Sequence, residues 1–137
     1  QKSNLVEIKS VTTEIDGEMQ KFLAESEDFD IKVVLETDRE IPATQLYIDV
    51  YDGRNVPVLS MPFSTDVHRN LAMGRHVVTF AIDNDLAFGD YRINIALQND
   101  SDRTVLAENV CRFHIKGIAA EVMSVVNPQK AVTVTMN

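Results

Sequence analysis

The dominant pattern along the chain is an alternation of apolar and polar residues with a period of two. The segment Asp30–Thr37 reads DIKVVLET and places Ile31, Val33 and Leu35 on one face. The same alternation recurs in four further segments, which are Gln45–Tyr51, His76–Ile82, Tyr91–Leu97 and Cys111–Ile115. This is the pattern of β-strands that bury one face and expose the other.

Turn residues separate these runs. Asp16-Gly17 and Asp52-Gly53 are typical of hairpins, because glycine adopts the positive φ that a tight turn needs. The spacing predicts nine strands, near residues 4–13, 18–23, 29–37, 44–52, 56–62, 75–83, 90–99, 103–107 and 109–117. Many short alternating strands at this spacing predict an all-β fold, an immunoglobulin-like antiparallel β-sandwich with an extra C-terminal strand.

The compact pattern ends at Gly117, so we predict a sandwich domain over residues 1–117 and a C-terminal tail over residues 118–137. After the break Asn127-Pro128, the segment Ala131–Met136 again alternates as a strand does. It is either an extra strand on its own sandwich or a strand given to a neighbour. We predict a homodimer in which this strand is exchanged.

Charge narrows the classes of partner. The 137 residues carry a formal net charge of -8, with 13 basic and 21 acidic residues. Phosphate backbones require clustered Lys and Arg, so no nucleic acid is expected as a partner, and anionic lipids are disfavoured for the same reason. A neutral ligand or a protein remains open. The chain begins at Gln1, so we expect it to be a piece of a longer protein.

Motifs for catalysis or metal binding are not found in the sequence. There is no phosphate-binding loop, no dinucleotide motif and no nucleophile elbow. The three histidines lie in separate segments, and Cys111 and His114 would point to opposite faces of one strand. We therefore predict no enzyme activity, no cofactor and no metal. The single cysteine, expected to be buried, excludes an intrachain disulfide and weakly favours the cytoplasm.

The outward positions of three strands nominate a binding face. If the strands near 44–52, 90–99 and 109–117 share a sheet, their outer faces combine aromatic, amide, carboxylate and guanidinium groups, which suit sugar rings and hydroxyls. The competing interpretation is an ordinary solvated face, which the alternation alone favours. The candidate carbohydrate-binding residues are Tyr47, Asp49, Tyr51, Arg92, Asn94, Gln98, Arg112 and His114.

Four stretches in order resemble one known family. They are IKSVTTEIDGE (Ile8–Glu18), LYIDVYDGRNVPVLSM (Leu46–Met61), VTFAIDNDLAFGDYRINIAL (Val78–Leu97) and LAENVCRFHIKG (Leu106–Gly117). Together they resemble the C-terminal domain of the Wzt-type ATP-binding subunit of ABC transporters that export O-antigen polysaccharide. The resemblance covers about residues 5–117, and its most diagnostic positions are Leu86, Gly89, Tyr91, Leu97, Phe113 and Gly117.

This resemblance implies a non-catalytic module that binds the O-antigen polysaccharide near its non-reducing end. It also implies an ATPase domain upstream, a transmembrane subunit as partner, and a location in the cytoplasm at the inner face of the inner membrane. No site residue is carried over from the family, and with no Trp in the chain, Tyr47 and Tyr51 would have to provide stacking. The alternative is a protein–protein interaction domain, and a glycan-processing enzyme is a distant third.

Overall fold

A computed structural model describes residues 6–117 and 133–136, and within these ranges the chain is built almost entirely from strands. The strands are β1 (Val6–Ile15), β2 (Glu18–Met19), β3 (Phe22–Ala24), β4 (Phe29–Thr37), β5 (Ile41–Pro42), β6 (Leu46–Asp52), β7 (Pro57–Pro62), β8 (Asn70–Leu71), β9 (Gly74–Ile82), β10 (Gly89–Asn99), β11 (Asp102–Lys116) and β12 (Thr133–Met136). One 3-10 turn, η1, spans Ala43–Gln45. No helix in the described ranges is long and apolar enough to cross a membrane.

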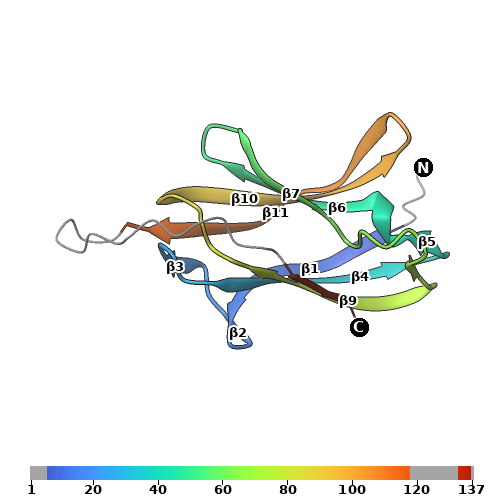
Figure 1. The fold of residues 1–137 in the computed structure, drawn as a ribbon, viewed down its shortest axis with the longest axis horizontal. Coiled ribbons are helices and arrows are strands. Elements are labelled where there is room, and N and C mark those ends of the chain that lie inside the picture. Colours follow the sequence, from blue (N-terminus) through green and yellow to red (C-terminus); the bar gives the residue numbers. More distant parts are fainter. Residues whose placement is uncertain (1–5, 118–132, 137) are drawn as a thin grey trace.

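The strands form two five-stranded sheets that lie face to face (Figure 1). The first sheet has the order β12-β9-β4-β1-β2 and the second β3-β11-β10-β6-β7, while β5 and β8 form a small separate pair. The neighbours β9-β4-β1 and β11-β10-β6 correspond to the two strand sets of an immunoglobulin-like sandwich. All pairings in the two large sheets are antiparallel except that of β3 with β11. The predicted fold class is confirmed.

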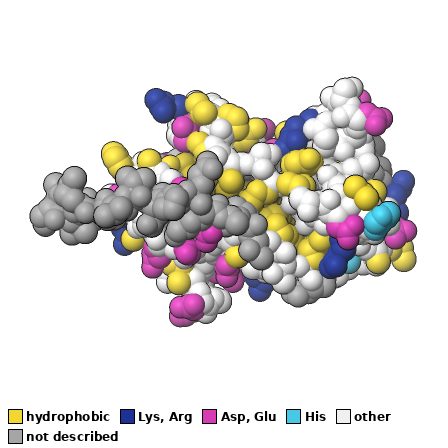
Figure 2. Space-filling view, in the orientation of Figure 1, with side chains coloured by type: hydrophobic (Ala, Val, Ile, Leu, Met, Phe, Trp, Pro, Cys, Tyr) yellow, Lys and Arg dark blue, Asp and Glu magenta, His cyan; other side chains and the backbone are white. Residues whose placement is uncertain are grey.

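The core lies between the sheets and consists of the apolar positions that the alternation marks. Each predicted inward set is buried, including Ile31, Val33 and Leu35 on β4 and the inward-facing apolar residues predicted for β6, β9, β10 and β11. Ring contacts cross the core, such as that of Phe63 with Phe80 at 5.1 Å between ring centroids. Figure 2 shows hydrophobic side chains along the seam between the layers, with charged side chains mostly outside it.

The predicted strand at 18–23 is wrong as a single element. The chain instead forms β2, which pairs with β1 in the first sheet, and then β3, which pairs with β11 in the second. Gln20 donates its backbone N–H to the carbonyl of Thr13 in the first sheet. The carbonyl of the next residue, Lys21, accepts the N–H of His114 in the second sheet, so the chain changes sheet between Gln20 and Lys21. The switch places Leu23 in the core and leaves Phe22 exposed.

The two strands predicted at 103–107 and 109–117 form one strand, β11, with an irregularity. Asn109 has a positive φ of 59°, and the pairing of β11 with β10 shifts register between Ile93 and Ala96. Two successive shifts occur here, because three steps along β10, from Ile93 to Ala96, correspond to six steps along β11, from Cys111 to Val105. The excess is an odd number of residues, so the outward positions change from odd to even numbers along the strand. Before the bulge Arg103 pairs with Gln98, and after it Arg112 pairs with Arg92.

The C-terminal segment forms β12, which pairs antiparallel with β9 of the same chain, Val134 opposite Phe80. The predicted strand at Ala131–Met136 is therefore present over Thr133–Met136, as an extra strand at the edge of the first sheet. The rest of the tail, residues 118–132 and 137, lies outside the described residues. Exchange of β12 between two copies stays a prediction.

Candidate binding face

The second sheet brings the predicted outward residues together in rows that cross β11, β10 and β6. Arg92 lies opposite Arg112 on one side and Tyr51 on the other. One step along, Asn94 lies opposite Asp49, and beyond it Ala96 lies opposite Tyr47. Directly opposite residues of antiparallel strands project to the same face, so these side chains share one surface.

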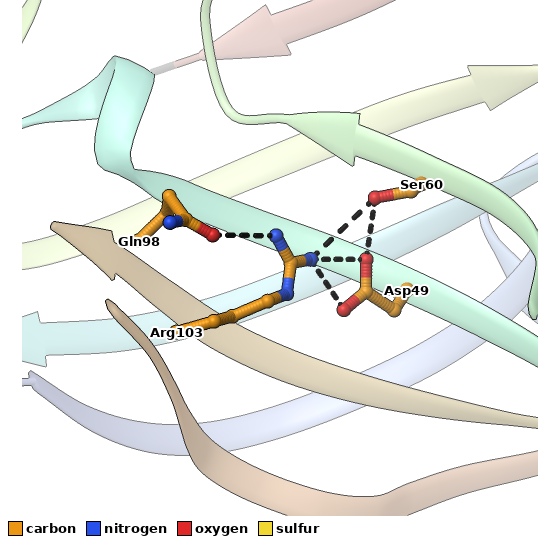
Figure 3. A network of polar contacts seen from close by, with 4 residues as sticks. All are labelled: Asp49, Ser60, Gln98 and Arg103. Atoms are coloured by element: carbon orange, nitrogen blue, oxygen red, sulfur yellow. Dashed lines mark hydrogen bonds and ion pairs between the residues drawn. The ribbon is translucent and has the colours of Figure 1, made fainter. Parts of the chain in front are cut away.

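At one end of this face a polar cluster surrounds Asp49, whose side chain is only 6% exposed (Figure 3). Arg103 Nη2 lies 2.6 and 2.5 Å from the two carboxylate oxygens, and the Ser60 hydroxyl donates to Oδ1 at 2.6 Å. The guanidinium carbon of Arg103 lies 4.6 Å from the centre of the Tyr47 ring, and Nη1 bonds Gln98 Oε1 at 3.2 Å. The cluster thus occupies the Asp49 carboxylate, one face of Tyr47 and the Gln98 carbonyl.

Arg103 and Ser60 were not among the predicted residues. Ser60 lies directly opposite Asp49 on β7, and Arg103 lies opposite Gln98 across the hairpin that joins β10 to β11. A hairpin predicted at Asp100-Ser101 would have placed Arg103 opposite Gln98. The alternation of residues 109–117 does not predict that Arg103 faces outward, because the bulge in β11 lies between them. Asn94 is also less accessible than predicted, because it is 6% exposed and its Oδ1 accepts the backbone N–H of Asn109 at 2.8 Å.

At the other end of the face, Arg92 covers Tyr51 without a carboxylate partner. Its guanidinium carbon lies 4.5 Å from the ring centre, and Nη2 donates to Asn55 Oδ1 at 2.5 Å. Its Nη1 is buried and has no hydrogen-bond partner among the described residues. The neighbouring Arg112 is exposed, and its guanidinium group forms no hydrogen bond or ion pair with any described residue. A shallow pocket of about 190 Å³ lies here, lined by Asp52, Gly53, Asn55, Asp90, Tyr91, Arg92 and Arg112.

The two carboxylates of this pocket have other partners. Asp52 Oδ1 accepts the backbone N–H groups of Arg54 and Val56 at 2.8 and 3.0 Å, and these bonds hold the pKa of Asp52 below its usual value. Asp90 Oδ1 lies 2.8 Å from His114 Nδ1. Neither carboxylate forms an ion pair with Arg92 or Arg112.

An exposed aromatic ring adjoins this end of the face. Phe22 on β3 lies opposite His114 on β11 and is 66% exposed. Its ring centroid is 6.0 Å from that of the His114 imidazole. His114 in turn contacts Asp90, so an open ring lies next to an imidazole–carboxylate pair. Phe22 was not predicted, because the sequence pattern did not show that its strand joins this sheet.

A larger pocket of about 530 Å³ lies away from this face, at the edge where β12 and the segment following β7 meet. It is lined by Met61, Pro62, Phe63, Ser64, Thr65, Asp66, Arg69, Val134, Thr135 and Met136. Phe63 is fully buried, so it offers no open ring to this pocket. The pocket therefore lacks the exposed aromatic surface found beside His114.

The side chains that could take part in covalent or metal chemistry are not brought together in the described residues. Cys111 is buried and faces the core, whereas His114 points outward, so the two do not form a pair, as the alternation predicts. Burial raises the pKa of the Cys111 thiol. Within the described ranges, no three His, Cys, Asp or Glu side chains are grouped so that they could hold a metal ion.

The fold and this face define an antiparallel β-sandwich domain with a polar and aromatic outer sheet surface. The structure is similar to the crystal structure of the C-terminal domain of wzt, with a TM-score of 0.66 and 15% sequence identity, over 83% of this chain and 75% of that chain. At that identity the likeness establishes a shared fold. The CARDB domain of a Pyrococcus furiosus protein, solved with di-metal ions, matches with a TM-score of 0.41 and 18% identity over 85% of this chain and 95% of that one. No family model and no curated protein matches the sequence.

Proposed function

We propose that this domain is a non-catalytic module that binds O-antigen polysaccharide for export by an ABC transporter. The observation that carries the proposal is the open end of the outer sheet face, where Phe22 and Arg112 are exposed beside the His114–Asp90 pair. A pyranose ring stacks its C–H face on an aromatic ring while its hydroxyls bond paired polar groups. The fold shared with the C-terminal domain of wzt supports the transport context.

The proposed site covers part of the predicted residue set. Tyr51, Arg92, Arg112 and His114 belong to the open end, to which we add Phe22 and Asn55. Tyr47, Asp49 and Gln98 belong to the Arg103 cluster, which supports the sheet face from within. Asn94 holds the bulge of β11 and does not reach the ligand.

In the full protein, this module would act beside an ATPase domain and a transmembrane subunit on the cytoplasmic side of the inner membrane. The module would recognise the polymer near its non-reducing end, and ATP hydrolysis would belong to the other domain. A binding role without chemistry agrees with the inward-facing Cys111 and with the exposed, shallow form of the site.

We also propose that the module is a homodimer that exchanges β12. In the single chain β12 forms the edge of the first sheet next to β9, and its pairing covers four residue pairs. A short edge strand at the end of a separate segment is a suitable element for exchange between copies. Sedimentation should show a dimer, and a chain truncated after Gly117 should sediment as a monomer. A monomer that persists at high concentration would exclude the exchange.

The sugar-binding role is tested by titrating the ¹⁵N-labelled chain with purified O-polysaccharides and following the backbone amide shifts. We expect the shifts to cluster at Phe22, Arg92, Arg112 and His114. Phe22→Ala should weaken binding by about ten-fold, because stacking on an aromatic ring is worth on the order of 1 kcal/mol or more. Met73→Ala, which removes an equally exposed apolar side chain on the β8–β9 connection, should bind as the parent does.

Two outcomes would refute the proposal. Shifts confined to the pocket between β7 and β12 would place sugar binding elsewhere. Absence of binding by any polysaccharide tested, together with capture of a defined protein partner by the Phe22 face, would favour the protein–protein interaction role.

A further inference from the structure

The outer sheet face contains two arginine–tyrosine stacks that differ in one component. Arg103 over Tyr47 is neutralised by the Asp49 carboxylate, which receives two hydrogen bonds from the same nitrogen. Arg92 over Tyr51 has the Asn55 amide oxygen as its acceptor, and no described carboxylate forms an ion pair with it. The second stack thus lacks the anion that completes the first.

A second cation increases this imbalance. Arg112 lies directly opposite Arg92 on the neighbouring strand, and like charges at opposite positions repel one another. Both arginines line the pocket of about 190 Å³, and Nη1 of Arg92 is buried without an acceptor among the described residues. An unsatisfied buried donor is costly, and a guanidinium pair binds oxyanions through short, charge-assisted hydrogen bonds.

We propose that the Arg92–Arg112 pair binds an oxyanion carried by a sugar residue, so that the module selects an acidic polysaccharide. This inference rests on the proposed sugar-binding role of the same face. The shared chemistry is a carboxylate or a phosphate ester attached to a pyranose ring. The ring lies towards Phe22 and His114, and the anion lies towards the two arginines.

The Asp52 and Asp90 carboxylates do not take the place of this anion. Asp52 is held by backbone N–H groups of its own turn, and Asp90 contacts His114. Asp90 is 84% exposed, so solvent screens its repulsion of a ligand. The lining of the pocket therefore combines two arginines with two carboxylates that are already hydrogen-bonded.

The test titrates the full 137-residue chain with sodium glucuronate, glucose 6-phosphate and glucose, and follows arginine side-chain and backbone NMR signals. At least one of the two acids should shift the signals of Arg92 and Arg112 and bind about ten-fold or more tightly than glucose. Comparing the two acids identifies the source of the oxyanion. Arg112→Gln should remove most of this preference for the acid over glucose.

Arg75→Gln is the matched control, because Arg75 is an exposed arginine on β9 of the other sheet and the substitution makes the same change in net charge. An equal loss with both variants would mean non-specific attraction and would overturn the proposal. Equal binding of sodium acetate and glucuronate would overturn it too, since the sugar would then contribute nothing. If neutral oligosaccharides bind this face as tightly as the acids, the charge selectivity fails while the sugar-binding role stands.

Discussion

Arg103 neutralises Asp49 at one end of the outer face of the second sheet, with Nη2 within 2.6 Å of both carboxylate oxygens. The carboxylate is almost completely buried, whereas the arginine side chain remains 35% exposed. The ion pair therefore joins a buried carboxylate on β6 to an arginine side chain that is partly exposed to solvent. Its contacts also occupy the Asp49 carboxylate and one face of the Tyr47 ring, both in the predicted binding face.

Removing the arginine should destabilise the fold. Arg103→Gln leaves the Asp49 charge buried with only the Ser60 hydroxyl to compensate it, and removes the contact with Tyr47. We expect the free energy of unfolding to fall by about 2 kcal/mol, which is less than the roughly 3–5 kcal/mol of a fully buried pair because Arg103 is partly exposed. Urea unfolding measures this loss.

A double-mutant cycle separates the ion pair from the packing of the arginine stem. Asp49→Asn combined with Arg103→Gln should recover part of the loss, because no unpaired charge remains. Arg39→Gln serves as control, since Arg39 is exposed and contacts its sequence neighbour Asp38, and it should cost less than about 0.5 kcal/mol. Equal losses for Arg39→Gln and Arg103→Gln would contradict a structural role for the cluster.

Asn84 joins two segments that are distant in sequence, its own segment after β9 and the turn between β3 and β4. It is 1% exposed, its Nδ2 donates to the carbonyls of Ala24 and Glu27, and its Oδ1 accepts the N–H of Leu86. Asn84→Ala leaves these backbone groups without partners, so we expect a loss of about 2–3 kcal/mol in the free energy of unfolding. Calorimetry or urea unfolding measures it. Asn70→Ala removes one exposed bond to Glu40 and should cost far less, so similar losses would refute the interpretation.

Asp30 should make stability depend on pH. Burial raises the pKa of its carboxyl above the usual range, and the carboxylates of Glu14 and Asp16 raise it further. Glu14 lies directly opposite Asp30 on the neighbouring strand. Because the folded carboxyl holds its proton more tightly than the unfolded one, the stabilisation is present at pH below the unfolded value and is lost as pH rises through the raised value.

Asp30→Asn removes the repelling charge. We expect the free energy of unfolding at pH 7 to rise by roughly 0.5 kcal/mol, and the gain to disappear in acid, where Asp30 of the parent is protonated. Thermal unfolding between about pH 3 and about pH 7 follows the difference, because this interval runs from below the ordinary pKa values of carboxyl groups to well above them. Asp85→Asn, an exposed aspartate in the turn after β9, is the control. A gain that persists unchanged in acid would show that charge is not its cause.

The period-two alternation was sufficient to predict the sandwich and its core. It identifies inward residues such as Ile31, Phe80 and Ile93 without reference to strand order, because burial on one face is a local property of each strand. The alternation also placed Asp49, Arg92 and His114 on the outward face of one sheet, where the structure has them.

The composition of the site was harder to predict. Arg103 faces outward because the register shifts between Cys111 and Val105 together reverse the alternation of β11, and such bulges have no strong signal in a single sequence. Phe22 joins the face because the chain changes sheets after Gln20, which depends on pairing across the fold. Partners such as Asn55 come from a turn whose side-chain direction the alternation does not describe.

The opposed arginines provide a final prediction, which concerns the ligand-free chain. Arg112 makes no ion pair with any described residue, and its nearest cross-strand neighbour is another arginine, so its charge is expected to cost stability rather than contribute it. Arg112→Gln should raise the free energy of unfolding by roughly 0.5 kcal/mol, whereas Arg75→Gln removes the same charge next to Glu36 and should not raise it. The repulsion is screened by salt, so the gain should shrink at high ionic strength. Urea unfolding at low and high salt measures both effects. A loss of stability in Arg112→Gln would show that Arg112 stabilises the fold, and would contradict the interpretation that its charge lacks a partner in the ligand-free chain.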